Sequence, residues 1–571
     1  MTHVVEQGAR SSVMSTARDL STAITDASGA VLAMPIGMPT HVFNLSPTVR
    51  AVLKYHGDSM RPGDAFLNNS PYDGCTHMAD HTIIVPVFFD GELVFFCVVR
   101  GHQADVGNAA PTTYSERARD IYEEGAVCFP CVRIQQDYAD MDDIIRIARY
   151  RIRCPDVWYG DYLAMIGAAR IGERQLVELL TARGRGLLEG FCRDWQEYGR
   201  KRMVEHIAGL PRGTWSGHSR HDPIPGLLPG GVDVKVRVSI MPEEGEIEVD
   251  LRGNGPPVAC GLNLCEATTV AAARAGIMNR MPPDMPLCEG AMERIRVLFD
   301  DPGVVGAAVL PFSASVATTN VANRLLLAVQ CVWSQVSEEL GMAEGNVEMG
   351  PGEAVISGND SRYGREYVTE LLSGTAGGMG VYGHDGYVDY GPSGGGMEYW
   401  NPVEVVEQKY PVLYLQQEIV PDSAGAGRWD GGPASRLVIA TRQDPVTFMY
   451  IGDGAVNPPK GCAGGRDGSP TRALRRCVKA ESEEPLPMCH RVTLQPGEAL
   501  VSECASGGGY GDPLDREPEL VRHRVEEGWT TAERAREVYG VVLEGVGDLN
   551  VDAEATQALR RQLRSRKGVG R

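Results

Sequence analysis

The clearest pattern in the chain is a pair of apolar runs that flank a two-residue turn. Residues 82–89 (TIIVPVFF) and 92–99 (ELVFFCVV) are rich in β-branched and aromatic side chains, and Asp90-Gly91 separates them. An Asp-Gly pair between two such runs predicts a β-hairpin. This hairpin is the firmest local prediction in the chain.

Polar residues gather where the predicted hairpin opens. A two-residue loop places Ala79 opposite His102 and Asp80 opposite Gly101, with His77 just before the first strand. Two imidazoles and a carboxylate at one rigid edge favour a divalent metal with open coordination positions. The competing interpretation is that these residues only cap the strand ends, and a β-bulge would change the pairing.

Further apolar patterns before residue 210 predict strands at 20–25, 30–34 and 65–67. Helical spacing predicts a helix over 141–153 and a long helical run over 156–202, with breaks at glycines such as Gly184.

In the middle of the chain the spacing of the apolar residues changes. Residues 211–229 are rich in Gly, Pro and His and are typical of a linker. Alternating patterns at 232–240 and 246–251 predict half-buried strands, and 263–281 and 320–340 have helical spacing.

From about residue 350 the chain is rich in glycine clusters between short apolar runs, which favours a β-rich module with tight turns. The tail predicts helices at 518–527, 531–539 and 553–565. We therefore expect an α+β fold, large and mixed, with an N-terminal β-hairpin metal site, long helices and a glycine-rich, β-rich C-terminal half. The expected regions are 1–210, 211–345, 346–515 and 516–571, or a single interwoven catalytic unit.

The net charge and the composition limit the kinds of molecule that the protein is expected to bind and the compartment in which it is expected to lie. A net charge of -20 argues against nucleic acid or an anionic membrane, because both select basic surfaces. No stretch reaches the ~20 apolar residues that span a bilayer, and the first ten residues do not form a secretory signal. We expect a cytoplasmic protein whose 14 cysteines are mostly buried thiols.

Several short motifs follow one another in a fixed order. They include Pro62-Gly-Asp64, Asn69-Ser-Pro-Tyr72, Thr76-His77-x-x-Asp80, Arg100-Gly-His102-x-Ala-Asp105, Glu248-Val-Asp250, Pro421-Asp-Ser-x-Gly-Ala-Gly427, Gly507-Gly-Gly-Tyr510-Gly-Asp512-Pro513 and Tyr539-Gly-Val-Val542. In this order, over about residues 11 to 545, the chain resembles the hydantoinase B/oxoprolinase family. Ordered motifs over such a span are far more specific than any one of them.

The resemblance implies a metal-dependent, catalytic B-type chain of an ATP-dependent cyclic-amide hydrolase. In that scheme a hydantoinase A-type partner binds ATP and phosphorylates the substrate, and the B-type chain carries a divalent metal (Mn, Zn or Fe). The chain has no GxxxxGK[ST] phosphate loop, which is compatible with this division. The alternatives are a component of a ketone carboxylase of the acetone or acetophenone type, and a non-catalytic assembly subunit.

The resemblance also implies site residues. The metal ligands would be His77, Asp80 and His102. Asp19 matches a family Arg-Asp-Phe-Ser segment, and His41 matches a family Pro-x-His position. Asp19 or Asp105 is the expected general base, and Asp105 has the alternative role of orienting His102.

The chain departs from the family pattern at two positions near these residues. Ser70 stands where the family usually has Asp, and Gln103 stands where it usually has His. Neither change removes an expected ligand, but each is expected to alter either the residues that support the ligands or the substrate pocket.

Overall fold

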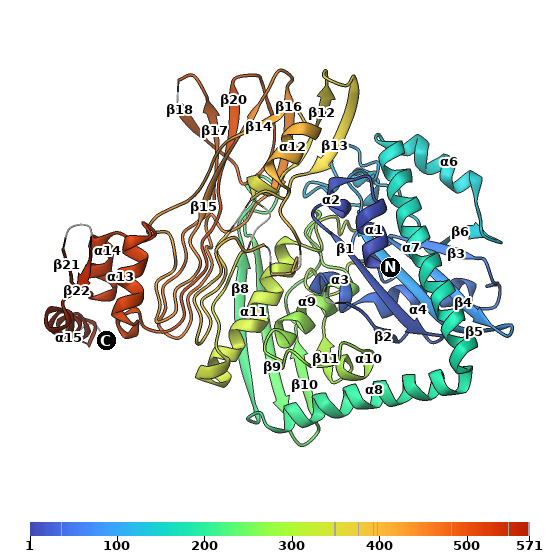
Figure 1. The fold of residues 1–571 in the computed structure, drawn as a ribbon, viewed down its shortest axis with the longest axis horizontal. Coiled ribbons are helices and arrows are strands. Elements are labelled where there is room, and N and C mark those ends of the chain that lie inside the picture. The colour runs from blue at the N-terminus through green and yellow to red at the C-terminus, as the bar shows by residue number, and fades with distance from the viewer. Residues whose placement is uncertain are drawn as a thin grey trace.

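A seven-stranded antiparallel sheet forms the N-terminal part of the molecule, in the order β2-β1-β5-β4-β3-β6-β7 (Figure 1). The computed structural model describes residues 1–568 except 36, 348–349, 375, 392, 397, 481 and 546–547. The strands are β1 (Leu20–Asp26), β2 (Val31–Ala33), β3 (Ala65–Asn68), β4 (Asp80–Phe89), β5 (Glu92–His102), β6 (Val132–Gln136) and β7 (Ala139–Asp140). The predicted hairpin is β4 and β5, at the centre of the sheet.

The register of this hairpin differs from the predicted one by one residue. Near the turn the pairing is as expected, but an irregularity between Val87 and Phe88 shifts the rest of the ladder. Asp80 therefore lies opposite His102, and the predicted pair of Asp80 with Gly101 is wrong. A bulge inserts one unpaired residue and so changes every later pair.

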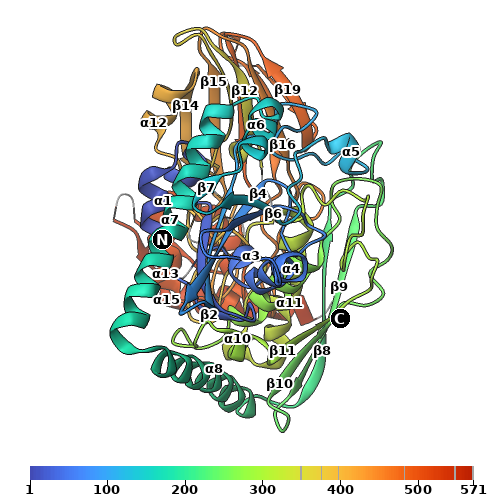
Figure 2. The same ribbon diagram turned by 90° about the vertical axis from the view of Figure 1, so that its right-hand side faces the viewer.

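Both faces of this sheet are buried, which explains why its strands are continuous apolar runs. One face packs against α7 (Pro155–Arg183) and the other against α4 (Leu45–His56), as Figure 2 lets the reader follow. Within β4, Ile83 belongs to the first core and Ile84 to the second, as the two-residue period of a strand requires.

The long helical run predicted over 156–202 is two helices. α7 ends at Gly184, whose φ of 83° is accessible to glycine at little cost, and α8 (Arg185–Ala208) then runs along the base of the molecule (Figure 1). The shorter helix predicted over 141–153 is α6 (Asp142–Arg151).

A second sheet has four strands in the order β11-β10-β9-β8 and packs against α9 (Glu266–Met278) and α11 (Asn320–Val336). Its strands are β8 (Gly213–His221), β9 (Val232–Met241), β10 (Glu246–Asp250) and β11 (Ile295–Leu298). The predicted linker at 211–229 is therefore wrong in its first half. β8 is an edge strand whose alternate residues, Thr214, Ser216, His218 and Arg220, are exposed and polar, so its composition resembles that of a loop.

Two further sheets face each other across one apolar core. The first contains β12 (Val355–Asp360), β13 (Arg365–Glu370), β16 (Val446–Ile451) and β19 (Cys489–Leu494), and the second β14 (Val412–Ile419), β15 (Ser435–Thr441), β17 (Arg472–Cys477), β18 (Ser482–Leu486) and β20 (Glu498–Glu503). Phe448 of the first sheet and Leu437 of the second both lie in this core. The predicted β-rich module is therefore confirmed.

Most of the glycine clusters of this module do not form the expected tight turns. They are extended segments that run side by side between the β-sandwich and the C-terminal helices (Figure 1). A turn does occur at 462–465, where Gly465 N donates to the Cys462 carbonyl at 2.9 Å. Gly377 N donates to the Ala505 carbonyl at 3.0 Å, and Gly432 N donates to the Gly378 carbonyl at 2.7 Å. A Cβ atom on Gly377 would lie 2.0 Å from the Gly432 carbonyl oxygen, so these glycines allow close approach of backbones.

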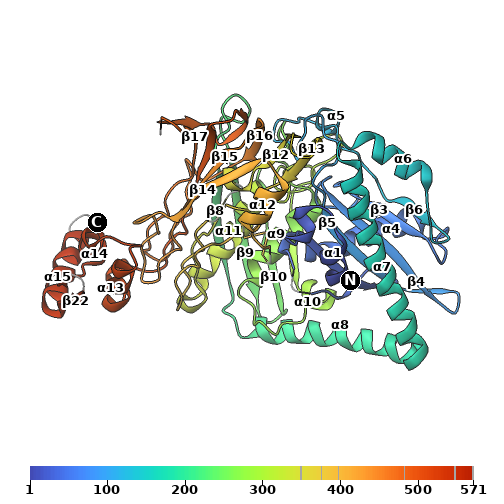
Figure 3. The ribbon, with the colours of Figure 1, turned by 45° about the horizontal axis from the view of Figure 1, so that its top comes forward.

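The tail forms α13 (Pro518–Glu526), α14 (Ala532–Tyr539), the β21-β22 hairpin (Leu543–Glu544 and Asn550–Val551) and α15 (Ala553–Gly568), a lobe at the end of the molecule far from α7 (Figure 3). Among the described residues, no helix is both long and apolar enough to cross a membrane. The mixed architecture agrees with the predicted α+β class, whereas the division into four regions stays a prediction.

Gly377→Ala is expected to destabilise the protein by about 1–3 kcal/mol, because the added methyl group meets backbone that cannot move away. Gly167→Ala is the matched control. Gly167 lies within α7 with no atom within 4 Å of the added Cβ, so alanine should stabilise by about 0.5–1 kcal/mol. Thermal unfolding of both variants tests this, and a Gly377→Ala midpoint at or above wild type would contradict it.

Candidate metal centre

The three expected metal ligands meet at one end of the first sheet. Asp80 begins β4, His102 ends β5, and the two are paired across the strands. His77 precedes β4, and Asp80 N donates to its carbonyl at 3.1 Å in a tight turn. All three side chains are buried. Residues opposite each other on neighbouring strands have adjacent side chains, so the register itself brings Asp80 and His102 together.

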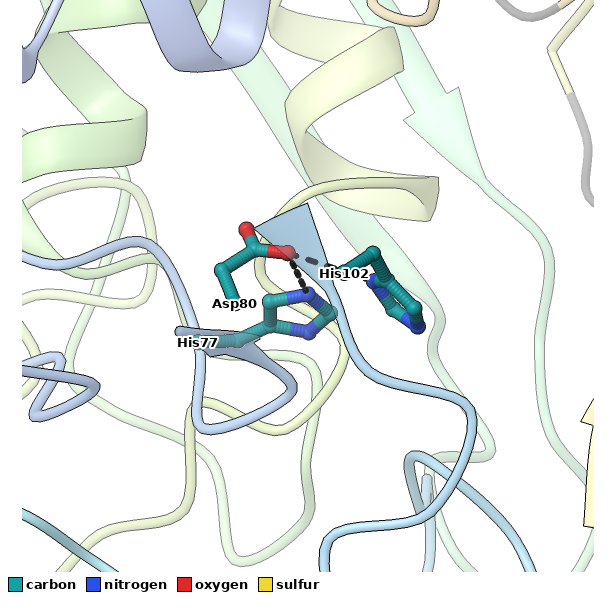
Figure 4. Close-up of side chains that lie close together, drawn as sticks. All are labelled: His77, Asp80 and His102. Atoms are coloured by element: carbon teal, nitrogen blue, oxygen red, sulfur yellow. Dashed lines mark hydrogen bonds and ion pairs between the residues drawn. The ribbon is translucent and has the colours of Figure 1, made fainter. Parts of the chain in front are cut away.

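One oxygen of Asp80 faces both histidines (Figure 4). His77 Nε2 lies 3.1 Å from Asp80 Oδ1, and His102 Nδ1 lies 3.2 Å from the same atom. Three potential ligand atoms thus converge on one point.

In each histidine, the ring nitrogen that faces away from Asp80 has a hydrogen-bond partner, and that partner determines which nitrogen carries the proton. His77 Nδ1 donates to the Ser315 carbonyl at 2.8 Å. Thr113 Oγ1 donates to the Gln103 carbonyl at 2.7 Å and therefore accepts from His102 Nε2 at 3.0 Å. Each neutral ring then points its lone pair at Asp80 Oδ1.

Two lone pairs and a carboxylate oxygen repel one another unless a proton or a cation lies among them. Burial alone would lower the pKa of His77, but Asp80 raises it above its ordinary value. Burial would raise the pKa of Asp80, but His77 and His41 hold it well below its usual range. His77 Nε2 is buried without a hydrogen-bond partner. Two imidazoles and a carboxylate suit a divalent metal, which would replace that proton.

The second oxygen of Asp80 is held from two sides. His41, in α3 (Pro39–Val42), donates from Nε2 to Asp80 Oδ2 at 3.0 Å, and Thr76 Oγ1 donates to the same atom. Burial lowers the pKa of His41, so it is neutral and keeps its role as a donor. His41 therefore orients Asp80 and leaves Oδ1 for the cation.

Asp19 lies immediately before β1 and beside His102. Its carbonyl accepts from His102 N at 3.1 Å, and its carboxyl Oδ2 lies 3.7 Å from His102 Nδ1. The other oxygen, Oδ1, is buried without a hydrogen-bond partner. Burial, and then the charges of Glu398, Asp80 and Glu370, raise the pKa of Asp19 well above its ordinary value. A carboxylate in this state accepts a proton readily.

Asp105 lies outside this pocket. Its two carboxyl oxygens accept from Gly107 N at 3.0 Å and from Cys154 N at 2.9 Å, so the side chain holds the loop after β5. Thr113, and not Asp105, orients His102 through the outer ring nitrogen. The position of Asp105 supports neither of the two roles expected for it.

The pocket contains two acidic residues that the sequence did not single out. Glu370 ends β13, where Tyr114 donates to its Oε1 at 2.8 Å and its Oε2 lies 3.6 Å from His102 Nε2. Burial raises the pKa of Glu370, while burial followed by the charges of Glu370 and Asp80 raises that of Glu398 to about 8. The available signal for Glu370 was an acidic residue directly before two apolar residues, Leu371 and Leu372.

These residues surround a cavity of about 30 Å³, room for an ion or one or two waters. It is lined by Asp19, Met38, Thr40, His41, His77, Asp80, His102, Tyr114, Thr318, Thr319, Glu370, Leu372, Gly394, Gly395 and Glu398. No lysine or arginine is among them, while four are carboxylates, so the cavity attracts cations. Asp19, His102 and Glu370 form a second set with ligand atoms within 4.8 Å of one another.

The fold and this pocket define a protein class with a buried histidine and carboxylate centre at the end of an antiparallel sheet. A family model described as hydantoinase B/oxoprolinase matches residues 1–513. The chain belongs to the hydantoinase B/oxoprolinase family, as its motifs indicated.

Individual relatives agree with this assignment. The chain is 30% identical to the beta subunit of caprolactamase from Pseudomonas jessenii, over 98% of this chain and 96% of that protein. It is 27% identical to the B component of a putative D-/L-hydantoinase from a Pseudomonas species, over 90% and 86% of the two chains.

Two solved structures share the fold. The crystal structure of ATP-dependent caprolactamase from Pseudomonas jessenii matches with a TM-score of 0.89 and 28% identity, covering 98% of this chain and 96% of that one. A nucleotide-free acetone carboxylase matches with a TM-score of 0.88 and 18% identity, covering 100% and 81%. The second likeness concerns the fold alone.

Purified protein is expected to carry about one equivalent of a divalent metal, and His102→Ala is expected to lose it while remaining folded, because one of three ligands is removed. His218→Ala is the control, since His218 is exposed on β8. Elemental analysis measures the metal and circular dichroism the fold. Less than about a tenth of an equivalent in the wild-type protein would contradict the metal assignment.

Thr113→Val should weaken metal binding about 10–100-fold, because His102 Nε2 loses the acceptor that fixes its orientation. Thr113→Ser keeps the hydroxyl group and should bind like wild type. Competition with a chelator gives the dissociation constants. Equal affinities for the valine and serine variants would show that Thr113 does not orient the ligand.

Proposed function

We propose that this chain is the metal-dependent B-type component of an ATP-dependent cyclic-amide hydrolase. A hydantoinase A-type partner would bind ATP and phosphorylate the carbonyl oxygen of the ring, and this chain would complete the hydrolysis. The observation that carries the proposal is the convergence of His77, Asp80 and His102 on one point inside a buried acidic pocket. The names of the relatives support an arrangement of two different chains.

The chemistry follows from the stability of amides. Nitrogen donation stabilises the carbonyl of an unactivated lactam, and phosphorylation of its oxygen removes that stabilisation. A divalent metal held by His77, Asp80 and His102 would supply Lewis-acid character and lower the pKa of bound water. The side chains around the metal position would accept protons and orient the ligands.

Asp19 is the proposed general base, since its Oδ1 is buried without a hydrogen-bond partner and its Oδ2 lies 3.7 Å from the proposed ligand atom His102 Nδ1. His41 holds Asp80 in place through its Nε2 donor.

A component of a ketone carboxylase is the second candidate, because acetone carboxylase shares the fold over the whole chain. In that case the same pocket would hold an enolate while carbon dioxide attacks. The higher identity to caprolactamase favours the hydrolase. An assembly subunit without catalysis is the third candidate, and the intact ligand set argues against it.

Reconstitution with an A-type partner separates these functions. We expect ATP-dependent conversion of a cyclic amide to an amino acid without carbon from labelled bicarbonate in the product, and no ATP hydrolysis by this chain alone. His102→Ala should lower the rate by at least about 10²-fold while the complex still forms. Labelled carbon in the product would select the carboxylase, and full activity of His102→Ala would reject the assigned site.

A further inference from the structure

Glu398 reaches the metal pocket from an element that contributes none of the proposed ligands. It lies between β13 and α12 (Val403–Lys409), in a segment whose Gly394 and Gly395 also border the cavity. Its Oε2 atom is buried and has no hydrogen-bond partner. Buried polar atoms are nearly always hydrogen-bonded, so an unpaired one that lines a cavity suits contact with a bound molecule.

The backbone around Glu398 is arranged to let its carboxyl group reach the cavity. A Cβ atom on Gly395 would lie 2.5 Å from Glu398 Oε2, so any larger residue would displace that group. Thr40 donates from N and Oγ1 to the Gly394 carbonyl, at 3.3 Å and 3.1 Å, which ties the segment to α3. Gly396 is exposed, and its added Cβ would only make ordinary contact, 3.4 Å from Pro39 Cδ.

The proposed hydrolysis creates a need for an acid at this place. Addition of water to the phosphorylated ring gives a carbon that bears a hydroxyl group, a phosphate group and the ring nitrogen. If the bond between this carbon and the phosphate oxygen breaks, the lactam is restored and ATP has been consumed without ring opening. If the C–N bond breaks, the ring opens. Because an amine leaves only after it gains a proton, a positioned acid decides between the two outcomes.

We propose that Glu398 is the acid that protonates the ring nitrogen and thereby couples ATP consumption to ring opening. This inference rests on the proposed function. Asp19 takes a proton from the attacking water and, once the ring is open, passes it to the released amine, which becomes an ammonium group. Glu398 then gives its proton to nitrogen, the C–N electron pair moves to nitrogen, and the hydroxyl oxygen becomes a carbonyl as its proton returns to the Glu398 carboxylate. A second water hydrolyses the resulting acyl phosphate to carboxylate and phosphate.

The charges around Glu398 support an acid role. The titratable groups that line the same cavity are Asp19, His41, His77, Asp80, His102, Tyr114 and Glu370. Burial is the main cause that raises the pKa of Glu398 to about 8, and the charges of Glu370 and Asp80 add to it. A carboxyl group in this setting keeps its proton near neutral pH and is a donor.

The test uses the full chain with its A-type partner, and caprolactam, 5-oxoproline and hydantoin as substrates. ADP and ring-opened product are measured together. In wild type the ratio of ADP to product is expected near one. Glu398→Gln is expected to lower ring opening about 10²-fold while ADP formation continues, so the ratio rises by a similar factor. A Glu398→Gln ratio equal to the wild-type ratio would overturn the inference.

Matched variants separate this role from damage to the fold. Glu366→Gln changes an exposed glutamate on β13 and should leave the ratio at the wild-type value. Gly395→Ala should raise the ratio because it displaces the Glu398 carboxyl, whereas Gly396→Ala should not.

Metal content and unfolding temperature should be unchanged in Glu398→Gln. Loss of metal from that variant would make Glu398 a ligand and overturn the acid role. If wild type opens none of the three lactams, the proposed function fails. If wild type opens a lactam and Glu398→Gln stays coupled, only this inference fails.

Discussion

The arrangement of the site depends on one atom, the Oδ1 oxygen of Asp80. His77 and His102 both aim a lone pair at it, since Ser315 and Thr113 occupy their outer nitrogens. Such an arrangement is repulsive in a buried pocket unless positive charge lies between the three atoms. The hydrogen bonds of the fold thus call for a proton or a cation at this point, and the proposed metal would fill that position.

Part of this site could be read from the sequence. The Asp-Gly turn between two apolar runs predicted the hairpin, and the ends of that hairpin carry Asp80 and His102. The register was missed because a bulge is set by local packing that the alternation of residues does not reveal. The partners of the histidine rings were also missed, because Ser315 is distant in sequence and a threonine carries no visible signal.

The same limit applies to the distant wall of the pocket. Glu370 and Glu398 line the pocket only because the β-sandwich packs against the N-terminal sheet. The local sequence around these residues does not predict that tertiary contact. Glycine clusters between short strands predict turns, whereas most of the clusters in this chain permit close packing of extended backbones. The composition shows that glycines are clustered, but they are required because backbone segments distant in sequence pack closely in the folded protein. Asp105 resembled a site residue by motif, yet its oxygens serve the backbone of a loop.

The proposed metal centre at the open end of the hairpin and the proposed acid Glu398 together account for a pocket lined by four acidic residues and three histidines, with no lysine or arginine. The most direct test of the central claim is a crystal structure with anomalous diffraction recorded at the absorption edge of the metal found in the protein. The account predicts a strong anomalous peak within bonding distance of His77 Nε2, His102 Nδ1 and Asp80 Oδ1. A metal-loaded crystal with its peak elsewhere, and only water among these three atoms, would contradict it.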